Sequence, residues 1–138
     1  MTALISASVV CKAQFYDLDP MQVVWHGNYA RFLELARCAL MEKIGYSYGE
    51  MAESGTLWPI VDMRLKYVRS VVLNQEIEVK ATLADYRHRL RIDYRISDAG
   101  TGQILTKAQT TQVAIDAQSR EMSLESPPML IERVEALL

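Results

Sequence analysis

The chain has 138 residues, of which 50% are hydrophobic and 23% are charged, and its formal net charge is −2. This length and composition are typical of a single globular domain, so we expect residues 1–138 to share one hydrophobic core. The near-neutral charge excludes a general attraction to nucleic acid, and we expect no nucleic-acid partner. No stretch approaches the roughly 20 apolar residues of a membrane span.

The compartment and the absence of a metal are inferred from the N-terminus and from the cysteines. The first ten residues lack a basic start and a long apolar run, so we expect no secretion signal and a cytoplasmic protein. Cys11 and Cys38 are then expected to be reduced and buried. Neither has metal-ligand spacing, and the two histidines add too few ligands for zinc, so we assign no metal.

The first half of the chain predicts a strand and a long helix. The strand covers residues 7–15 and ends in an acidic turn, where Pro20 keeps Asp19 extended. A helix is predicted from about Asn28 to Ile44, because apolar residues recur there at helical spacing and a glycine follows. A short helical turn is expected over residues 48–53.

The second half of the chain is rich in predicted strands, in which apolar and polar residues alternate. These strands cover residues 59–67, 76–83, 89–96 and 103–116. A turn is predicted at 98–102, and Pro127-Pro128 opens a short C-terminal helix. The elements together predict an α+β fold, with an antiparallel sheet of about five strands, four of them in a meander, wrapped around one long helix. A dimer would cover an edge of such a sheet.

Two acidic residues and a histidine precede the long helix, namely Asp17, Asp19 and His26. A helix start offers unpaired N–H donors and a positive dipole end, which suits a reaction that develops negative charge on oxygen. A carboxylate beside it can act as a base or as a nucleophile. Taken alone, an aspartate at this position would be interpreted as a turn-forming residue.

The stretch from Phe15 to Arg37 resembles the hotdog-fold acyl-CoA thioesterases, in the group that includes the 4-hydroxybenzoyl-CoA and Tol-Pal-associated thioesterases. The resemblance rests on Asp17-x-Asp19, on Val23-Val24-Trp25-His26-Gly27-Asn28-Tyr29, and on Phe32-Leu33-Glu34 with Arg37. It implies a hotdog fold and hydrolysis of an acyl-CoA thioester to free acid and CoA. It also implies no cofactor beyond the CoA of the substrate, and a homodimer or homotetramer with its active site between subunits.

The resemblance assigns roles to individual residues of the motif. It makes Asp19 the catalytic general base or nucleophile and leaves Asp17 as a structural turn residue. His26 stands where members carry His or Tyr, and either its side chain orients the aspartate or water, or its backbone N–H binds the thioester carbonyl oxygen. Asn28 is expected to cap the helix or to contact substrate, and Tyr29 is expected in the core.

A basic cluster of Arg87, His88 and Arg89 lies where family members bind the phosphates of CoA. Arginine matches phosphate geometry well, so the cluster is a candidate CoA site. The alternative interpretation is an ordinary solvated face of the sheet, because basic and apolar residues alternate there.

The sequence departs from the family pattern at two positions. Gln22 replaces a glycine, which would permit a backbone shape that glutamine disfavours. The expected Tyr-x-x-Pro is Tyr67-Val68-Arg69-Ser70, most simply a strand bulge that lacks its proline. The acyl group therefore stays open, and several aromatic residues either line an aromatic acyl pocket or lie in the core. These residues are Tyr16, Trp25, Tyr46, Tyr48 and Trp58.

Two alternative functions are compatible with the same fold. A 3-hydroxyacyl-thioester dehydratase would need His26 and the helix residue Glu34, but Glu34 has Arg31 and Arg37 at ion-pairing distance along the helix. A non-catalytic acyl-CoA-binding module is the second alternative.

Overall fold

The structure, a computed structural model, describes residues 5–138. The expectation of no secretion signal rests partly on Met1–Leu4, which lie outside the described residues. The main sheet contains β1 (Ser6–Lys12), β3 (Ile60–Tyr67), β4 (Glu76–Asp85), β5 (Leu90–Asp98) and β6 (Ile104–Gln112). A smaller sheet contains β2 (Thr56–Leu57), β7 (Ala114–Asp116) and β8 (Met122–Ser123). The helices are η1 (Phe15–Asp17), η2 (His26–Asn28), α1 (Tyr29–Ile44), α2 (Tyr48–Glu53) and α3 (Pro128–Glu135).

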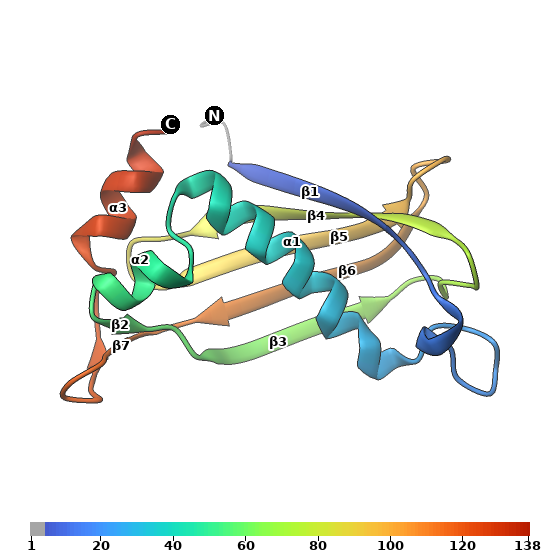
Figure 1. The fold of residues 1–138 in the computed structure, drawn as a ribbon, viewed down its shortest axis with the longest axis horizontal. Coiled ribbons are helices and arrows are strands. Elements are labelled where there is room, and N and C mark those ends of the chain that lie inside the picture. The colour runs from blue at the N-terminus through green and yellow to red at the C-terminus, as the bar shows by residue number, and fades with distance from the viewer. Residues whose placement is uncertain (1–4) are drawn as a thin grey trace.

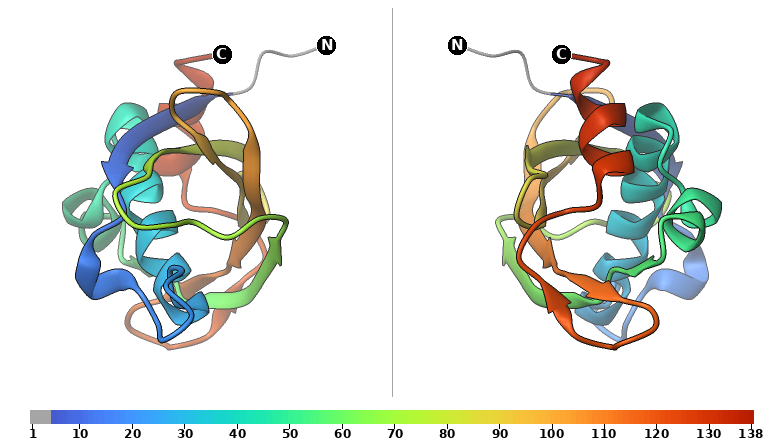
Figure 2. Two further views of the ribbon diagram at one scale, coloured as in Figure 1. Left: turned by 90° about the vertical axis from the view of Figure 1, so that its right-hand side faces the viewer. Right: turned by 90° about the vertical axis from the view of Figure 1, so that its left-hand side faces the viewer.

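The sheet curves around α1, which lies in its concave face (Figures 1 and 2). The apolar residues of α1 recur every three or four positions, so Phe32, Leu33 and Leu40 are at most 1% exposed. The helix ends at Gly45, whose φ of 82° is left-handed and suits a residue without Cβ. The predicted α+β class, with a five-stranded antiparallel sheet around one long helix, is confirmed.

The order of the strands differs from the predicted meander. The order is β1-β4-β5-β6-β3, so β3 pairs with β6 instead of with the next strand in sequence. Leu65 of β3 lies opposite Ala108 of β6, and Val79 of β4 lies opposite Ile96 of β5. Alternation of residue types predicts which face of a strand is buried, but it does not identify the neighbouring strand.

The apolar face of β3 is less buried than its alternating pattern predicts. Val61, Met63 and Tyr67 are 58%, 37% and 48% exposed. They are exposed because β3 is an edge strand of the sheet. An exposed apolar edge strand is a site where a second sheet can pair.

Three further sequence predictions need correction. The first strand ends at Lys12 instead of residue 15, because residues 15–17 turn into η1. The predicted strand 103–116 is divided at Val113 into β6 and β7, and β7 joins the smaller sheet. Both cysteines are free, but Cys11 is half-buried and Cys38 is exposed, because Cys38 faces a cavity beside α2.

Tyr94 on β5 should make the free energy of unfolding decrease with rising pH in the alkaline range. Its hydroxyl shares a 2.9 Å hydrogen bond with Oγ1 of Thr110, and burial raises the pKa of Tyr94 from 10.0 to about 12. In the unfolded chain the same tyrosine ionises at a lower pH, near its ordinary pKa of 10.0. The stabilisation is therefore complete below pH 10 and is lost as the pH rises towards 12, by about 2–3 kcal/mol. Urea unfolding between pH 9 and 12 should show this loss, and Tyr94→Phe should remove it. An equal pH slope in both proteins would contradict the assignment.

Candidate functional site

A short hairpin formed by residues 17–25 connects η1 to η2. The N–H of Trp25 donates to the carbonyl of Asp17, and the N–H of Asp19 donates to the carbonyl of Val23, each at 2.9 Å. Gln22 closes the tip by donating to the carbonyl of Asp19, also at 2.9 Å. The hairpin therefore fixes Asp19 two residues beyond Asp17, whose carbonyl is bonded to Trp25 just before η2.

The carboxylate of Asp19 lies at the tip of this hairpin and is partly exposed. Its Oδ1 accepts a 2.8 Å hydrogen bond from the N–H of Met21, which is typical of an Asx turn. Among the described residues, the other carboxylate oxygen accepts no hydrogen bond. Asp19 is thus oriented through one oxygen, while the second is available to a water molecule or a substrate.

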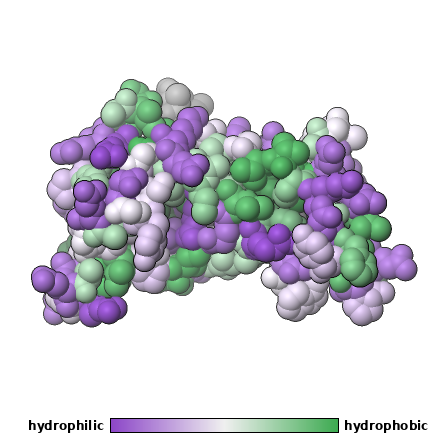
Figure 3. All heavy atoms as spheres, viewed as in Figure 1, coloured by the Kyte–Doolittle hydropathy of each residue, from purple (hydrophilic) through white to green (hydrophobic). Residues whose placement is uncertain are grey.

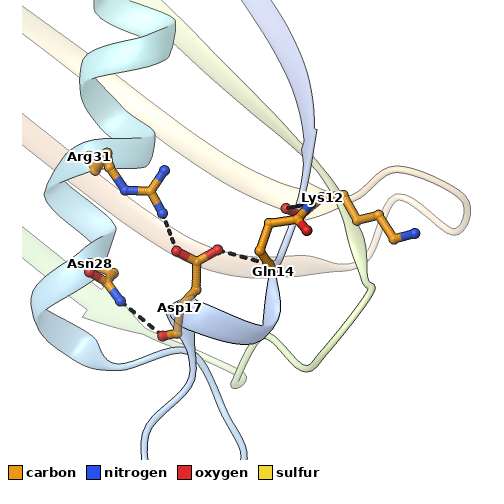
Figure 4. A network of polar contacts seen from close by, with 5 residues as sticks. All are labelled: Lys12, Gln14, Asp17, Asn28 and Arg31. Atoms are coloured by element: carbon orange, nitrogen blue, oxygen red, sulfur yellow. Dashed lines mark hydrogen bonds and ion pairs between the residues drawn. The ribbon is translucent and has the colours of Figure 1, made fainter.

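Asp17, in contrast, is buried, and both its carboxylate and its backbone carbonyl are engaged in hydrogen bonds or an ion pair. Its side chain accepts a 2.8 Å hydrogen bond from the N–H of Gln14 and forms an ion pair with Arg31, as Figure 4 shows. Its carbonyl accepts a 2.9 Å hydrogen bond from the side chain of Asn28. These contacts tie the end of β1 to the start of α1, so the two aspartates have different roles.

Two predictions about this helix change as a result. Asn28 occupies the N-cap position of α1, but its side chain does not cap the helix and instead crosses to Asp17. The expected cluster around Glu34 is half present, because Glu34 pairs with Arg37 at 2.5 Å while Arg31 pairs with Asp17.

The start of η2 leads directly into α1, and within the described part of the chain no side chain caps either helix. The first N–H groups of a helix have no partner inside it, and within the described residues those of His26 and Gly27 donate no hydrogen bond at this positive end. The hydroxyl of Tyr67 donates to the carbonyl of His26 at 3.2 Å, which holds that segment against β3. The ring of Trp25 packs over Gly27, where an added Cβ would lie only 2.4 Å from it.

Gln22 has a φ of 65°, the left-handed conformation that favours glycine. The turn expected for a glycine at this position therefore forms with glutamine as well. A hairpin tip of this length commonly ends in a left-handed residue, and that conformation costs an L-residue roughly 1–2 kcal/mol. Glycine avoids this cost, but its larger conformational entropy in the unfolded chain offsets part of the gain in stability. We expect Gln22→Gly to stabilise the protein by about 0.5–1 kcal/mol. Urea unfolding measures this change, and a destabilised variant would mean that the glutamine side chain makes a compensating contact.

The basic cluster lies at the turn between β4 and β5, and its members are exposed. Arg87 pairs with Glu135 at 2.6 Å, Arg89 pairs with Asp85 at 3.3 Å, and the His88 ring contacts the carbonyl of Leu124 at 3.3 Å. The acids leave part of each guanidinium free for a phosphate.

Asp19 and the basic cluster lie at opposite ends of the sheet. The end of β1, which leads to the hairpin, pairs with the first residue of β4, whereas the basic cluster follows the last. The ten residues of β4 span about 30 Å. A single chain therefore does not bring the two parts of the predicted site together.

The remaining departure from the family pattern is a bulge at the end of β3. The N–H groups of Val68 and Arg69 both donate to the carbonyl of Leu105 at 2.9 Å. The strand thus bulges without a proline, and Ser70 is exposed just after it.

Sequence reasoning missed the contacts of Tyr67 and Arg31, which join segments 41 and 14 residues apart. No local spacing signals such pairs. Among residues 5–138 no group of three His, Cys, Asp or Glu side chains is placed to hold a metal ion. In the same part of the chain, none of the helices has the length and apolar character needed to cross a membrane.

An antiparallel sheet wrapped around one long helix is the arrangement of the hotdog-fold thioester hydrolases, the class to which the chain's relatives belong. The chain belongs to the thioesterase-like superfamily, which it matches over residues 13–134.

Individual relatives agree with this membership. The Bacillus subtilis protein YneP, whose name places it among acyl-CoA thioesterases, is 27% identical over 109 residues, covering 78% of each chain. A DHNA-CoA thioesterase from Staphylococcus aureus is 28% identical with a TM-score of 0.77, covering 86% of this chain and 80% of its own. The fold also matches Slr0204 from Synechocystis, a 1,4-dihydroxy-2-naphthoyl-CoA thioesterase, with 21% identity and a TM-score of 0.84, covering 96% and 97% of the two chains.

Proposed function

We propose that this protein hydrolyses acyl-CoA thioesters, with Asp19 as the catalytic carboxylate and the backbone N–H of His26 as the donor to the thioester carbonyl oxygen. The observation that carries this proposal is the accessible carboxylate of Asp19 on a hairpin that ends at an uncapped helix start. Asp17, the other acid of the turn, is buried in an ion pair and is therefore unsuited to the reaction.

In the first form of the mechanism, Asp19 is a general base. It removes a proton from water as the water oxygen attacks the carbonyl carbon, and the carbonyl electrons move to an oxyanion held by the His26 N–H. The oxyanion then collapses and the C–S bond breaks. The CoA sulfur takes the proton from Asp19, which leaves free acid and CoA.

In the second form, the carboxylate of Asp19 is the nucleophile. It attacks the carbonyl carbon, expels CoA and forms a mixed anhydride, which water then hydrolyses. Both forms use the same helix start, because both develop negative charge on the carbonyl oxygen. His26 serves through its backbone, so its exposed ring remains free to orient the attacking water.

The proposal includes a dimer in which two β3 strands pair antiparallel. β3 is an edge strand with exposed apolar residues, and the outline of the molecule is recessed along it (Figure 3). The strand begins at Ile60, near the basic cluster, because Ile60 and Leu90 both pair with Gln112. It ends at Tyr67, near the hairpin, because Tyr67 contacts His26. A two-fold axis through β3 would exchange these ends and place Asp19 of one protomer near the basic cluster of its partner.

In that dimer, Arg87, His88 and Arg89 of the partner subunit would bind the phosphates of the CoA whose thioester meets Asp19. Binding the nucleotide would hold the thioester in place for attack. Asn28 uses one amide N–H on Asp17, and its contact with substrate stays a prediction. The cytoplasmic location and the absence of a cofactor also stay predictions.

Release of CoA from a panel of acyl-CoA thioesters tests the proposal. The wild type should turn over at least one acyl class, and Asp19→Asn should lose that turnover while still binding CoA. Binding of CoA without release from any thioester would contradict hydrolysis and favour a binding module. The dehydratase alternative gains no support, because Glu34 is paired with Arg37.

A further inference from the structure

A cavity of about 470 Å³ lies between the C-terminal half of α1, α2 and β2, and we call it the α1–α2 cavity. Six of its twelve lining residues are apolar, namely Cys38, Met41, Met51, Ala52, Leu57 and Trp58. The volume is within the range of about 300–1,000 Å³ that is usual for small-molecule sites. The cavity lies at the end of the sheet opposite the hairpin of the same chain, so the reaction at Asp19 does not by itself account for it.

The polar groups behind this lining are satisfied by one another. The indole N–H of Trp58 donates to the hydroxyl of Tyr46 at 3.0 Å, and that hydroxyl shares a 2.7 Å hydrogen bond with Oγ of Ser54. Ser54 in turn donates to the carbonyl of Met51 at 2.8 Å. The Trp58 and Tyr46 rings stand edge to face, at 88° and 6.4 Å. Trp58 is thereby fixed and presents carbon atoms to the cavity.

Gln112 closes the same wall without offering it a polar group. Its side-chain N–H donates to the carbonyl of Trp58 at 2.8 Å, and its Oε1 is inaccessible. The charged lining residues are Glu42 and Arg37, and Arg37 pairs with Glu34. The wall formed by Trp58 and Gln112 therefore suits an apolar ligand and offers no partner to a buried hydroxyl.

The position of the cavity connects it to the hairpin of a second copy. Trp58 lies just before β3, at the end of that strand opposite Tyr67. The start of β3 and the hairpin that precedes α1 lie at opposite ends of the sheet (Figure 1). The antiparallel pairing of β3 suggested above exchanges these ends. The α1–α2 cavity of one protomer then lies beside Asp19 of the partner subunit.

We propose that the α1–α2 cavity holds the acyl chain of the thioester, and that this chain is an unsubstituted aliphatic one. The inference rests on the proposed hydrolase function and assigns its substrate class. A hydroxylated aromatic acyl group that reached the wall of Trp58 and Gln112 would bury its hydroxyl without a partner, and an apolar wall disfavours such a group by on the order of 10–10².

A series of saturated acyl-CoA thioesters from acetyl to palmitoyl, compared with 4-hydroxybenzoyl-CoA, tests the assignment. The value of kcat/KM should rise by up to about four-fold per methylene until the cavity is filled. The hydroxylated aromatic thioester should be a poorer substrate than octanoyl- or decanoyl-CoA. A preference for 4-hydroxybenzoyl-CoA over every aliphatic thioester would overturn the inference while leaving the hydrolase function intact.

A cavity-filling variant locates the chain. Ala52 is exposed on α2 and lines the cavity, so Ala52→Trp fills it without disturbing the core. It should lower kcat/KM for decanoyl-CoA by about 10²-fold and leave acetyl-CoA within about three-fold of wild type. Cys38→Trp does the same from α1. Glu53→Trp is the matched control, because Glu53 is exposed on the same helix and lies outside the lining.

The outcomes separate this inference from the proposed function. Equal losses for short and long chains in Ala52→Trp and Cys38→Trp, or equal effects of the Glu53→Trp control, would overturn the cavity assignment. Absence of hydrolysis of every thioester by the wild type would instead contradict the hydrolase function itself.

Discussion

Replacing Asp19 with asparagine should lower kcat for acyl-CoA hydrolysis by about 10²–10⁴-fold, the usual contribution of a positioned base. The fold should survive the change. Asparagine can still accept the hydrogen bond from the N–H of Met21 that holds the hairpin tip, and the position is partly exposed. Only the charge and the basicity of the side chain disappear. The expected variant is therefore folded, binds CoA and is nearly inactive.

Asp17→Asn is the matched control, because it makes the same chemical change two residues away. Asp17 is buried and ion-paired, so its loss leaves Arg31 without its partner and should destabilise the protein by about 1.5–3 kcal/mol. Stopped assays of CoA release and urea unfolding on both variants separate the two roles. Full activity in Asp19→Asn would exclude Asp19 as the catalytic group. Unchanged stability in Asp17→Asn would contradict the role of Asp17 as an anchor.

A single turnover in ¹⁸O-labelled water tests for a nucleophilic Asp19, because label found in the enzyme requires an anhydride opened at its aspartyl carbon. A nucleophilic carboxylate forms a mixed anhydride, and attack of labelled water on its aspartyl carbon would leave ¹⁸O in the enzyme. A general base transfers only protons, so the label appears in the acid product alone. Mass spectrometry of the peptide that contains Asp19 reads the result.

The sequence predicts those parts of the fold that depend on local spacing. The bounds of α1 and α2 follow from helical periodicity and from Gly45, and the strands follow from alternation. The neighbour of β3 could not be predicted this way, because pairing with β6 joins segments that are distant in the chain. The exposure of Val61 and Met63 has the same origin, since alternation does not tell an edge strand from a central one.

The same division applies to the candidate site. The motif identifies Asp19 and His26 because their spacing is local. The anchor formed by Asp17 and Arg31 spans a turn and a helix, and only the fold reveals it. The α1–α2 cavity depends on Trp58 and Gln112, which are 54 residues apart. Sequence could propose aromatic residues near a pocket, but it could not show that the polar atoms of Trp58 and Tyr46 bond to each other.

The distance between Asp19 and the basic cluster leads to a prediction about paired subunits. Asp19→Asn and a double variant, Arg87→Glu with Arg89→Glu, should each be nearly inactive alone, the first in chemistry and the second in binding CoA phosphates. If each site combines Asp19 of one protomer with Arg87 and Arg89 of the partner subunit, a mixed dimer contains one intact site and one doubly defective site.

Co-expression of the two variants with different affinity tags therefore tests the shared site. Random pairing makes half of the dimers mixed, each with one working site, so the mixture should recover about a quarter of wild-type activity. Purified mixed dimers should recover about half. If the site were contained in one chain, each protomer of a mixed dimer would carry one defect, and activity would stay at the level of the parents. Recovery in the mixed dimer thus requires that two chains meet around one thioester, which is the arrangement that pairing of the β3 edges predicts.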